Sequence, residues 1–142
     1  MHSIRDIVRD KGATVRSIDP SVTVFEALQQ MADHGIGALL VLEDTKPVGL
    51  FSERDYARKL ALRGLRSRDT PVSAIMSSPV LTIRPDASVQ DGLQIMTEKF
   101  VRHLPVVDGS GVIGMVSIGD LVKAVIEDQQ ALIEQLESYL VR

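Results

Sequence analysis

The sequence contains no cysteine and no tryptophan, and aromatic residues make up only 4% of its 142 residues. The absence of cysteine excludes disulfides, thiolate metal sites and thiol nucleophiles. The scarcity of aromatic rings leaves little that could stack bases along a single-stranded nucleic acid. The core must therefore be built from aliphatic side chains, which are abundant in a chain that is 44% apolar.

A strong charge bias and a long apolar run are also missing. The formal net charge of −3 gives no electrostatic footprint for nucleic acid or for an anionic membrane surface. The N-terminal segment lacks the apolar stretch of a signal peptide, and no run approaches the ~20 apolar residues of a membrane span. We therefore expect a cytoplasmic protein that binds neither nucleic acid nor a membrane.

What the sequence does contain is an internal repeat at an offset of 65 residues. Chance rarely aligns a Gly-x-x-Ser-x-x-Asp string with so many apolar positions at one offset. The offset superimposes, without a gap, Val15 on Val80, Pro20 on Pro85, Leu28 on Leu93, Val41 on Val106, Gly49 on Gly114, Ser52 on Ser117 and Asp55 on Asp120. The chain is therefore two copies of one unit.

Each copy has the pattern β-α-β-β-α. The near-continuous apolar character of the first strand in each β-β pair predicts burial on both faces. The elements that we expect are extended segments at 14–18 and 80–83, helices opened by the capping boxes Thr23-x-x-Glu26 and Ser88-x-x-Asp91, strand pairs at 38–42 with 48–51 and at 104–107 with 112–116, and second helices after Ser52 and Ser117.

Further helices flank the copies. A helix at 3–11 ends at Gly12, a short helix spans 71–76, and the last helix runs on towards Leu140. The fold class is α/β (α+β), with two pseudo-symmetric repeats that pack as one body because each is too small to bury a good core alone. We divide the chain into an N-terminal helix (1–12), a first domain (13–70), a second domain (71–128) and a C-terminal helix extension (129–142).

The most specific motifs are Gly49-Leu-Phe-Ser-Glu-Arg-Asp55 and Gly114-Met-Val-Ser-Ile-Gly-Asp120. They match the Gly-hydrophobic-x-Ser/Thr-x-x-Asp signature of the cystathionine-β-synthase-type (CBS) domain family. Over nearly its whole length the chain resembles a tandem CBS pair, and in particular the stand-alone bacterial CBS-domain proteins. The resemblance implies a Bateman module, a non-catalytic regulatory unit with two clefts that bind AMP, ATP or NAD(H).

The resemblance also implies which residues line the clefts. Each cleft would take its Ser-x-x-Asp motif from one copy and its base-flanking strand from the other. The candidate residues are Ser52 and Asp55 with Arg102, His103 and Pro105 in one cleft, Ser117 and Asp120 with Lys11, Thr14, Gly37, Ala38 and Leu39 in the other, and in addition Arg54 and Met76.

The Ser-x-x-Asp motif has two interpretations. Serine at the N-cap with aspartate three residues later is a capping box that needs no ligand. In the second interpretation, the carboxylate accepts both hydroxyls of a ribose, while the serine and the helix N–H groups suit a phosphate. Because the motif recurs after a glycine-containing strand, we expect nucleotide binding. The two sites should be unequal, since Arg102 and His103 make one cleft more basic.

Two further features allow more than one interpretation. His103 is either a nucleotide contact or a buried histidine with satisfied hydrogen bonds. The basic run after Ser52 is either a solvated face or a source of phosphate or partner contacts; it consists of Arg54, Arg58, Lys59, Arg63, Arg66 and Arg68.

Nothing in the sequence indicates catalysis. There is no Walker A loop and no H-E-x-x-H motif, and the three histidines lack metal-ligand spacing. The glycines from Gly109 to Gly114 fit G-x-G-x-x-G, but a strand follows them instead of the helix that a dinucleotide site requires. We therefore expect no enzyme, no catalytic cofactor and no metal. A structural or protein-interaction module with empty clefts, an S-adenosylmethionine binder and a weak nucleotide hydrolase remain as alternatives.

The C-terminal segment continues an apolar stripe beyond the repeat, and a stripe of that length favours a helix–helix contact with a second subunit. We expect a homodimer formed through the CBS helices and an effector protein that the sequence does not identify. The stripe consists of Leu121, Val125, Leu132, Ile133, Leu136 and Leu140.

Overall fold

The computed structural model describes residues 1–12 and 14–141 and divides into two compact units. Unit 1 consists of Met1–Thr14 and Thr82–Arg142, and unit 2 of Val15–Leu81. Unit 1 therefore contains the second repeat together with the N-terminal helix. Unit 2 contains the first repeat together with the segment that links it to the second.

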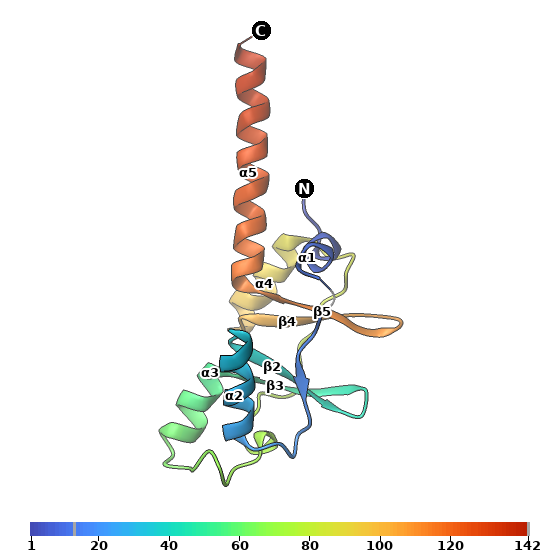
Figure 1. Cartoon of the computed structure of the whole chain (residues 1–142). Coiled ribbons are helices and arrows are strands. Elements are labelled where there is room, and N and C mark those ends of the chain that lie inside the picture. Colours follow the sequence, from blue (N-terminus) through green and yellow to red (C-terminus); the bar gives the residue numbers. More distant parts are fainter. Residues whose placement is uncertain (13, 142) are drawn as a thin grey trace. The chain divides into compact units, whose positions relative to one another are not determined.

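Unit 2 contains a three-stranded sheet in the order β1-β2-β3 (Figure 1). β1 (Ser17–Ile18) pairs in parallel with β2 (Ala38–Glu43), which pairs antiparallel with β3 (Lys46–Ser52). The first four residues of β2 are buried, which confirms the predicted burial of this strand on both faces. The extended segment predicted at 14–18 is shorter in the structure, because only its last two residues pair with β2.

Helix α2 (Val24–His34) covers this sheet, and its Val24, Ala27 and Met31 are buried. The helix begins after Thr23, whose hydroxyl accepts a hydrogen bond from the Glu26 backbone N at 3.2 Å. Only this half of the predicted capping box is formed among the described contacts. The core that α2 makes with the sheet also includes Ile18, Leu39, Val41, Phe51, Leu60, Val72 and Ile75.

The second helix of unit 2 is irregular. It consists of the short α3 (Glu53–Asp55) and a π-helical segment, η1 (Tyr56–Ala61), and the chain then turns at Gly64, where φ is +70°. A positive φ favours glycine, so the predicted helix end at Gly64 is confirmed. The short helix predicted at 71–76 is a single 3₁₀ turn, η2 (Val72–Ala74).

Unit 1 repeats the strand pair of unit 2. β4 (His103–Asp108) pairs antiparallel with β5 (Gly111–Ser117), and the pairing shifts register between Val106 and Val107, as it does between Val41 and Leu42 in unit 2. The predicted extended segment at 80–83 is not a strand; only Ile83 forms a parallel bridge, to Val106. Helix α4 (Val89–Lys99) opens with the predicted Ser88–Asp91 capping box.

The N-terminal helix α1 (Ile4–Lys11) packs within unit 1, although it precedes the first repeat in the chain. Its buried Ile4, Ile7 and Val8 join a core with residues of α4, β4, β5 and α5. The backbone N and Nδ1 of His2 lie 3.0 and 2.6 Å from the carboxylate of Asp128. These contacts fasten the start of the chain to the last helix.

Helix α5 (Ile118–Leu140) is 23 residues long and follows β5 directly. Figure 1 shows that its C-terminal half continues past α1, α4 and the β4–β5 hairpin. In that half, Leu132, Ile133 and Leu136 are 55%, 48% and 55% exposed. Among the described residues, no helix combines the length and the apolar character that crossing a membrane would require.

Candidate functional site

Both signature motifs form capping boxes at the start of a helix. Ser52 Oγ accepts from the Asp55 backbone N at 3.2 Å, and Asp55 Oδ2 accepts from the Ser52 N at 3.0 Å. In unit 1, the matching bonds between Ser117 and Asp120 measure 3.1 and 2.8 Å. The capping interpretation of the motif is therefore correct in both repeats. It leaves open what else each carboxylate binds, which depends on its other neighbours.

The signature glycine precedes the capping serine by three residues and admits a side chain from another element of the same unit. A Cβ on Gly49 would lie 2.3 Å from Met76 Sδ, and a Cβ on Gly114 would lie 2.7 Å from Val8 Cγ1. No real Cβ atom approaches a neighbour so closely. The glycines therefore let the chain after η2 pack against β3 in unit 2, and α1 pack against β5 in unit 1.

Asp55 is a buried carboxylate, with only 5% of the residue exposed. Besides the bond from Ser52 N, its Oδ2 accepts from Ser52 Oγ at 3.1 Å. Its Oδ1 lies 2.8 Å from Ser77 Oγ and 3.1 Å from Lys59 Nζ. Four donor groups thus surround the two carboxylate oxygens. This arrangement satisfies the buried charge, which would otherwise be costly.

Ser77 is held in place by its own backbone. Its N donates to Leu50 O at 2.8 Å, and its O accepts from Leu50 N at 2.9 Å, so the residue pairs with β3 like a short extra strand. Its Oγ also lies 3.3 Å from Lys59 Nζ. The sequence pattern alone assigns neither Lys59 nor Ser77 to Asp55. The i,i+4 spacing from Asp55 to Lys59 was the available signal for the lysine, whereas no pattern in the sequence indicates Ser77.

Asp120 has a more open environment. Its Oδ2 accepts from Ser117 N at 2.8 Å and from Lys11 Nζ at 2.7 Å, and its side chain is 23% exposed. Lys11 Nζ also donates to the Met115 carbonyl at 3.0 Å. The structure therefore brings together Lys11, Ser117 and Asp120, as the resemblance implied.

The charge state of Asp120 follows from these contacts. Burial alone would raise the pKa of its carboxyl group, but hydrogen bonds from Lys11 and Ser117, together with the positive charge of Lys11, hold the pKa below its ordinary value. Asp120 is consequently an anionic acceptor at neutral pH. It lies at the N-terminus of a long helix, where negative charge is favoured.

A small cavity of about 160 Å³ adjoins this carboxylate in unit 1. It is smaller than the ~300 Å³ at which ordinary ligand pockets begin, so it does not hold a nucleotide by itself. The cavity is lined by His2, Ile7, Asp10, Lys11, Asp120, Lys123, Ala124 and Glu127.

The remaining candidates of unit 2 lie around the start of β2. Gly37 O accepts from the Glu53 backbone N at 3.1 Å, and a hollow of about 410 Å³ beside Gly37 is lined mostly by apolar residues of α2 and the turn after it. Ala38 is buried and pairs with Ser52. Leu39 points into the hydrophobic core of unit 2, so only its backbone is available to a ligand.

The remaining candidates of unit 1 lie along β4 and at the end of α1. His103 pairs with Ser117, and the buried Pro105 pairs with Met115, so both lie beside the signature strand of their own repeat. Arg102 and Thr14 are exposed. The grouping of all these residues with the signature of the other repeat stays a prediction, as does the greater basicity of the Asp55 site.

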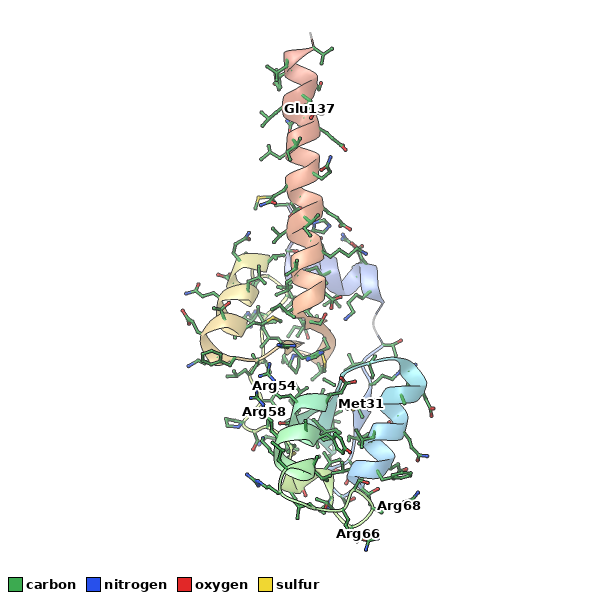
Figure 2. All side chains as sticks on the ribbon, turned by 90° about the vertical axis from the view of Figure 1, so that its left-hand side faces the viewer. Met31, Arg54, Arg58, Arg66, Arg68 and Glu137 are labelled. Carbon is green, nitrogen blue, oxygen red and sulfur yellow. The ribbon has the colours of Figure 1, made fainter. Side chains whose placement is uncertain are left out.

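The basic run after Ser52 does not form a single patch. Figure 2 shows Arg54 and Arg58 along the α3–η1 helix, and Arg66 and Arg68 in the loop beyond it. The Arg68 guanidinium stacks on the Phe25 ring, 3.8 Å from its centroid, and Arg66 pairs with Asp69 at 3.4 Å. These two arginines therefore have structural contacts of their own. Among the described residues, no group of histidine, aspartate and glutamate side chains is arranged to hold a metal ion.

Comparison with known proteins identifies relatives of this chain. The chain is 36% identical over 150 residues to the CBS domain-containing protein CBSX3, mitochondrial, of Arabidopsis thaliana, covering 97% of this chain and 71% of that protein. It is 36% identical to the CBS domain-containing protein YhcV of Bacillus subtilis, covering 85% and 84%. The solved structure of a protein with CBS domains from Burkholderia ambifaria superimposes with a TM-score of 0.86 at 42% identity, covering 90% and 96%.

The model of the CBS domain matches the chain twice, over residues 4–62 and 72–127. These two matches include both Ser-x-x-Asp motifs and leave the whole second half of α5 outside. The chain belongs to the CBS-domain family and contains two copies of the domain in tandem.

Proposed function

We propose that this CBS pair is a regulatory module that binds an adenine nucleotide (AMP, ATP or NAD(H)) without converting it. Tandem CBS domains are commonly regulatory and non-catalytic. The observation that carries the ligand assignment is the Asp120 carboxylate, which is partly exposed, negatively charged and placed at a helix N-terminus beside the Lys11 ammonium.

The chemistry of this site suits the sugar and phosphate of a nucleotide. The carboxylate accepts the two ribose hydroxyls as charge-assisted hydrogen bonds, each contributing about 1.5–3 kcal/mol. An aspartate by itself would repel a phosphate, but Lys11 supplies a cation 2.7 Å from the carboxylate oxygen. The N–H groups in the first turn of α5 provide further donors for an anion.

The test is isothermal titration calorimetry with AMP, ATP and NADH. We expect saturable binding of at least one of them, and 2′-deoxy-AMP should bind about tenfold more weakly than AMP because one hydroxyl bond to the carboxylate is lost. Inorganic phosphate serves as the control for simple anion binding. A flat titration with all three nucleotides would show instead that the pair is an interaction module with empty sites. Preferential binding of S-adenosylmethionine would also contradict the proposal, as would hydrolysis of ATP detected by chromatography.

We also propose that the chain forms a homodimer, and that the distal half of α5 is the contact. Exposed apolar residues recur along this helix with the alternating 4-3 spacing of a coiled-coil seam. Isoleucines occupy one seam position, at Ile126 and Ile133, and the other holds Val122, Gln129 and Leu136. Isoleucine at the first position with leucine at the second, as at Ile133 and Leu136, favours two parallel strands, so a second copy of the same helix is the partner that this pattern fits.

A further inference from the structure

We infer that the chain binds one nucleotide, at Asp120, and that Asp55 is a structural latch whose acceptor sites are already filled. The inference rests on the function proposed above and specifies which signature performs it. The two motifs are equivalent in the sequence, which by itself predicts two sites. Their surroundings in the structure are not equivalent.

The acceptor capacity of Asp55 is used within unit 2. A carboxylate offers about four acceptor positions, and four donor groups lie within 3.1 Å of the two oxygens of Asp55. A ribose could reach this carboxylate only by displacing the Ser77 hydroxyl or the Lys59 ammonium. Because Asp55 is 5% exposed, the displaced groups would have to leave a nearly closed site.

Asp120 retains unused capacity. Within residues 1–12 and 14–141, two donor groups contact it, both at Oδ2, which fills about half of the four acceptor positions of a carboxylate. Two positions are what a ribose diol requires. With 23% of its side chain exposed, Asp120 can accept a ligand without losing the bonds that cap α5 or that hold Lys11.

The asymmetry comes from residues that break the repeat. At the offset of 65, Ser77 aligns with Gly12, and Lys59 aligns with Ala124. The second repeat therefore lacks both groups that occupy Oδ1 of Asp55 in the first repeat, namely the serine hydroxyl and the lysine ammonium. Conversely, the lysine at the Asp120 site has no counterpart in the first repeat. Lys11 aligns with Met76, whose side chain packs over Gly49.

Lys11 is the residue that we assign to phosphate recognition at the Asp120 site. Its side chain is 43% exposed and its ammonium group is anchored by the Met115 carbonyl. Lys59 is tied instead to both Asp55 and Ser77. At the Asp120 site, the carboxylate can accept the ribose hydroxyls and the Lys11 ammonium can bind the phosphate. The site therefore favours a ligand that contains both a ribose and a phosphate, such as AMP, over adenosine.

Stoichiometry tests the assignment directly. In calorimetry with AMP, we expect one AMP per chain for the wild type, and Asp120→Asn should weaken binding about ten- to a hundredfold with no second site remaining. Asparagine retains a side-chain oxygen that can accept the capping bond from the Ser117 backbone N. Two AMP per chain, or an Asp120→Asn chain that still binds one AMP with wild-type affinity, would overturn the inference while leaving nucleotide binding intact. Absence of binding to AMP, ATP and NADH would instead remove the proposed function itself.

A matched pair of lysine variants gives a test that does not depend on the aspartates. Lys11→Met introduces the residue that the other repeat has at the equivalent position. We expect it to weaken AMP binding about tenfold and to reduce the preference for AMP over adenosine. Lys59→Met should leave AMP affinity within about twofold and lower the melting temperature instead. The opposite pattern would show that Asp55 is the ligand site, and circular dichroism would verify that both variants fold.

Discussion

At the scale of single residues, the two signature aspartates show how one motif supports two roles. Both take part in a capping box at the start of a helix. Asp55 is enclosed by Ser52, Ser77 and Lys59, whereas Asp120 is partly exposed and forms an ion pair with Lys11. The motif and its capping bonds are the same in the two copies. The role is decided by residues outside the motif.

Replacing Asp55 should therefore cost more stability than replacing Asp120. Asp55→Asn removes a buried charge that is paired with Lys59 and bonded to two hydroxyls, and we expect a loss of about 2–4 kcal/mol. Asp120→Asn should cost about 1 kcal/mol, because it loses fewer bonds at a more exposed position. Urea denaturation of both variants without ligand measures the two losses. Equal losses would contradict the distinction between a latch and an open acceptor.

The lowered pKa of Asp120 makes part of the stability dependent on pH. Because the folded-state pKa lies below the unfolded value of about 3.9, the contribution is present above about pH 4 and disappears as the pH falls through the folded-state pKa. Lys11→Met should thus destabilise the protein at pH 7, and the difference from the wild type should shrink at pH 3. Denaturation curves at both pH values would show this, whereas a constant difference would mean that Lys11 acts by packing alone.

The residues of the site were only partly predictable. The family signature indicated Asp120 and Ser117, and the resemblance added Lys11, which does contact Asp120. Ser77 reaches Asp55 only because its backbone pairs with Leu50 across a loop, and a long-range pairing of this kind leaves no periodic pattern in a sequence. Leu39 was assigned from its strand, but the alternation of side chains turns it into the core.

At the scale of elements, the sequence pattern predicted both hairpins and four of the helices closely, because their periodicities and caps are local. The short extended segments at 14–18 and 80–83 were predicted too long, since an edge segment pairs only where a neighbouring strand is present. The stripe of Ile4, Ile7 and Val8 predicts that α1 has a buried face. The stripe does not specify which surface this face covers, because an amphipathic pattern shows that one side of a helix is buried but not against which other element.

The two signature glycines should differ in their tolerance of alanine. In Gly49→Ala, the new Cβ meets the Met76 side chain, which is flexible and can adjust. In Gly114→Ala, the Cβ meets Val8, a β-branched side chain close to the backbone of α1. We expect a loss of about 2–3 kcal/mol for Gly114→Ala and about 1 kcal/mol for Gly49→Ala. Thermal denaturation of the two variants compares them, and a larger loss for Gly49→Ala would refute this explanation.

At the scale of the whole molecule, the distal half of α5 is the feature that extends beyond the residues matched by the CBS-domain model. Its seam residues Ile133 and Leu136 are 48% and 55% exposed. Glu137, which Figure 2 places near the far end of the helix, contributes to the acidic character of this half.

The assembly can be tested on this helix. Ile133→Asp with Leu136→Asp places two charges in the seam, and we expect the dimer to dissociate to a monomer in sedimentation velocity experiments. Ser138→Asp adds a charge at a position away from the seam and should leave the dimer intact. If the double variant remains dimeric, the subunits associate through another surface. If the wild type is a monomer, the proposal of a dimer fails.

The placement of α1 on the second repeat has a consequence for synthesis on the ribosome. Unit 2 is one continuous stretch, Val15–Leu81, so all the residues of its core are present once that stretch has emerged. Helix α1 emerges earlier but has to wait for β5 and the first turns of α5, about 110 residues later. At ribosomal rates of about 5–20 residues per second, the apolar face of α1 lacks its partner for roughly 10 s. The newly made chain therefore completes its second domain by recruiting its own first helix, so the first helix to be translated is among the last elements to pack.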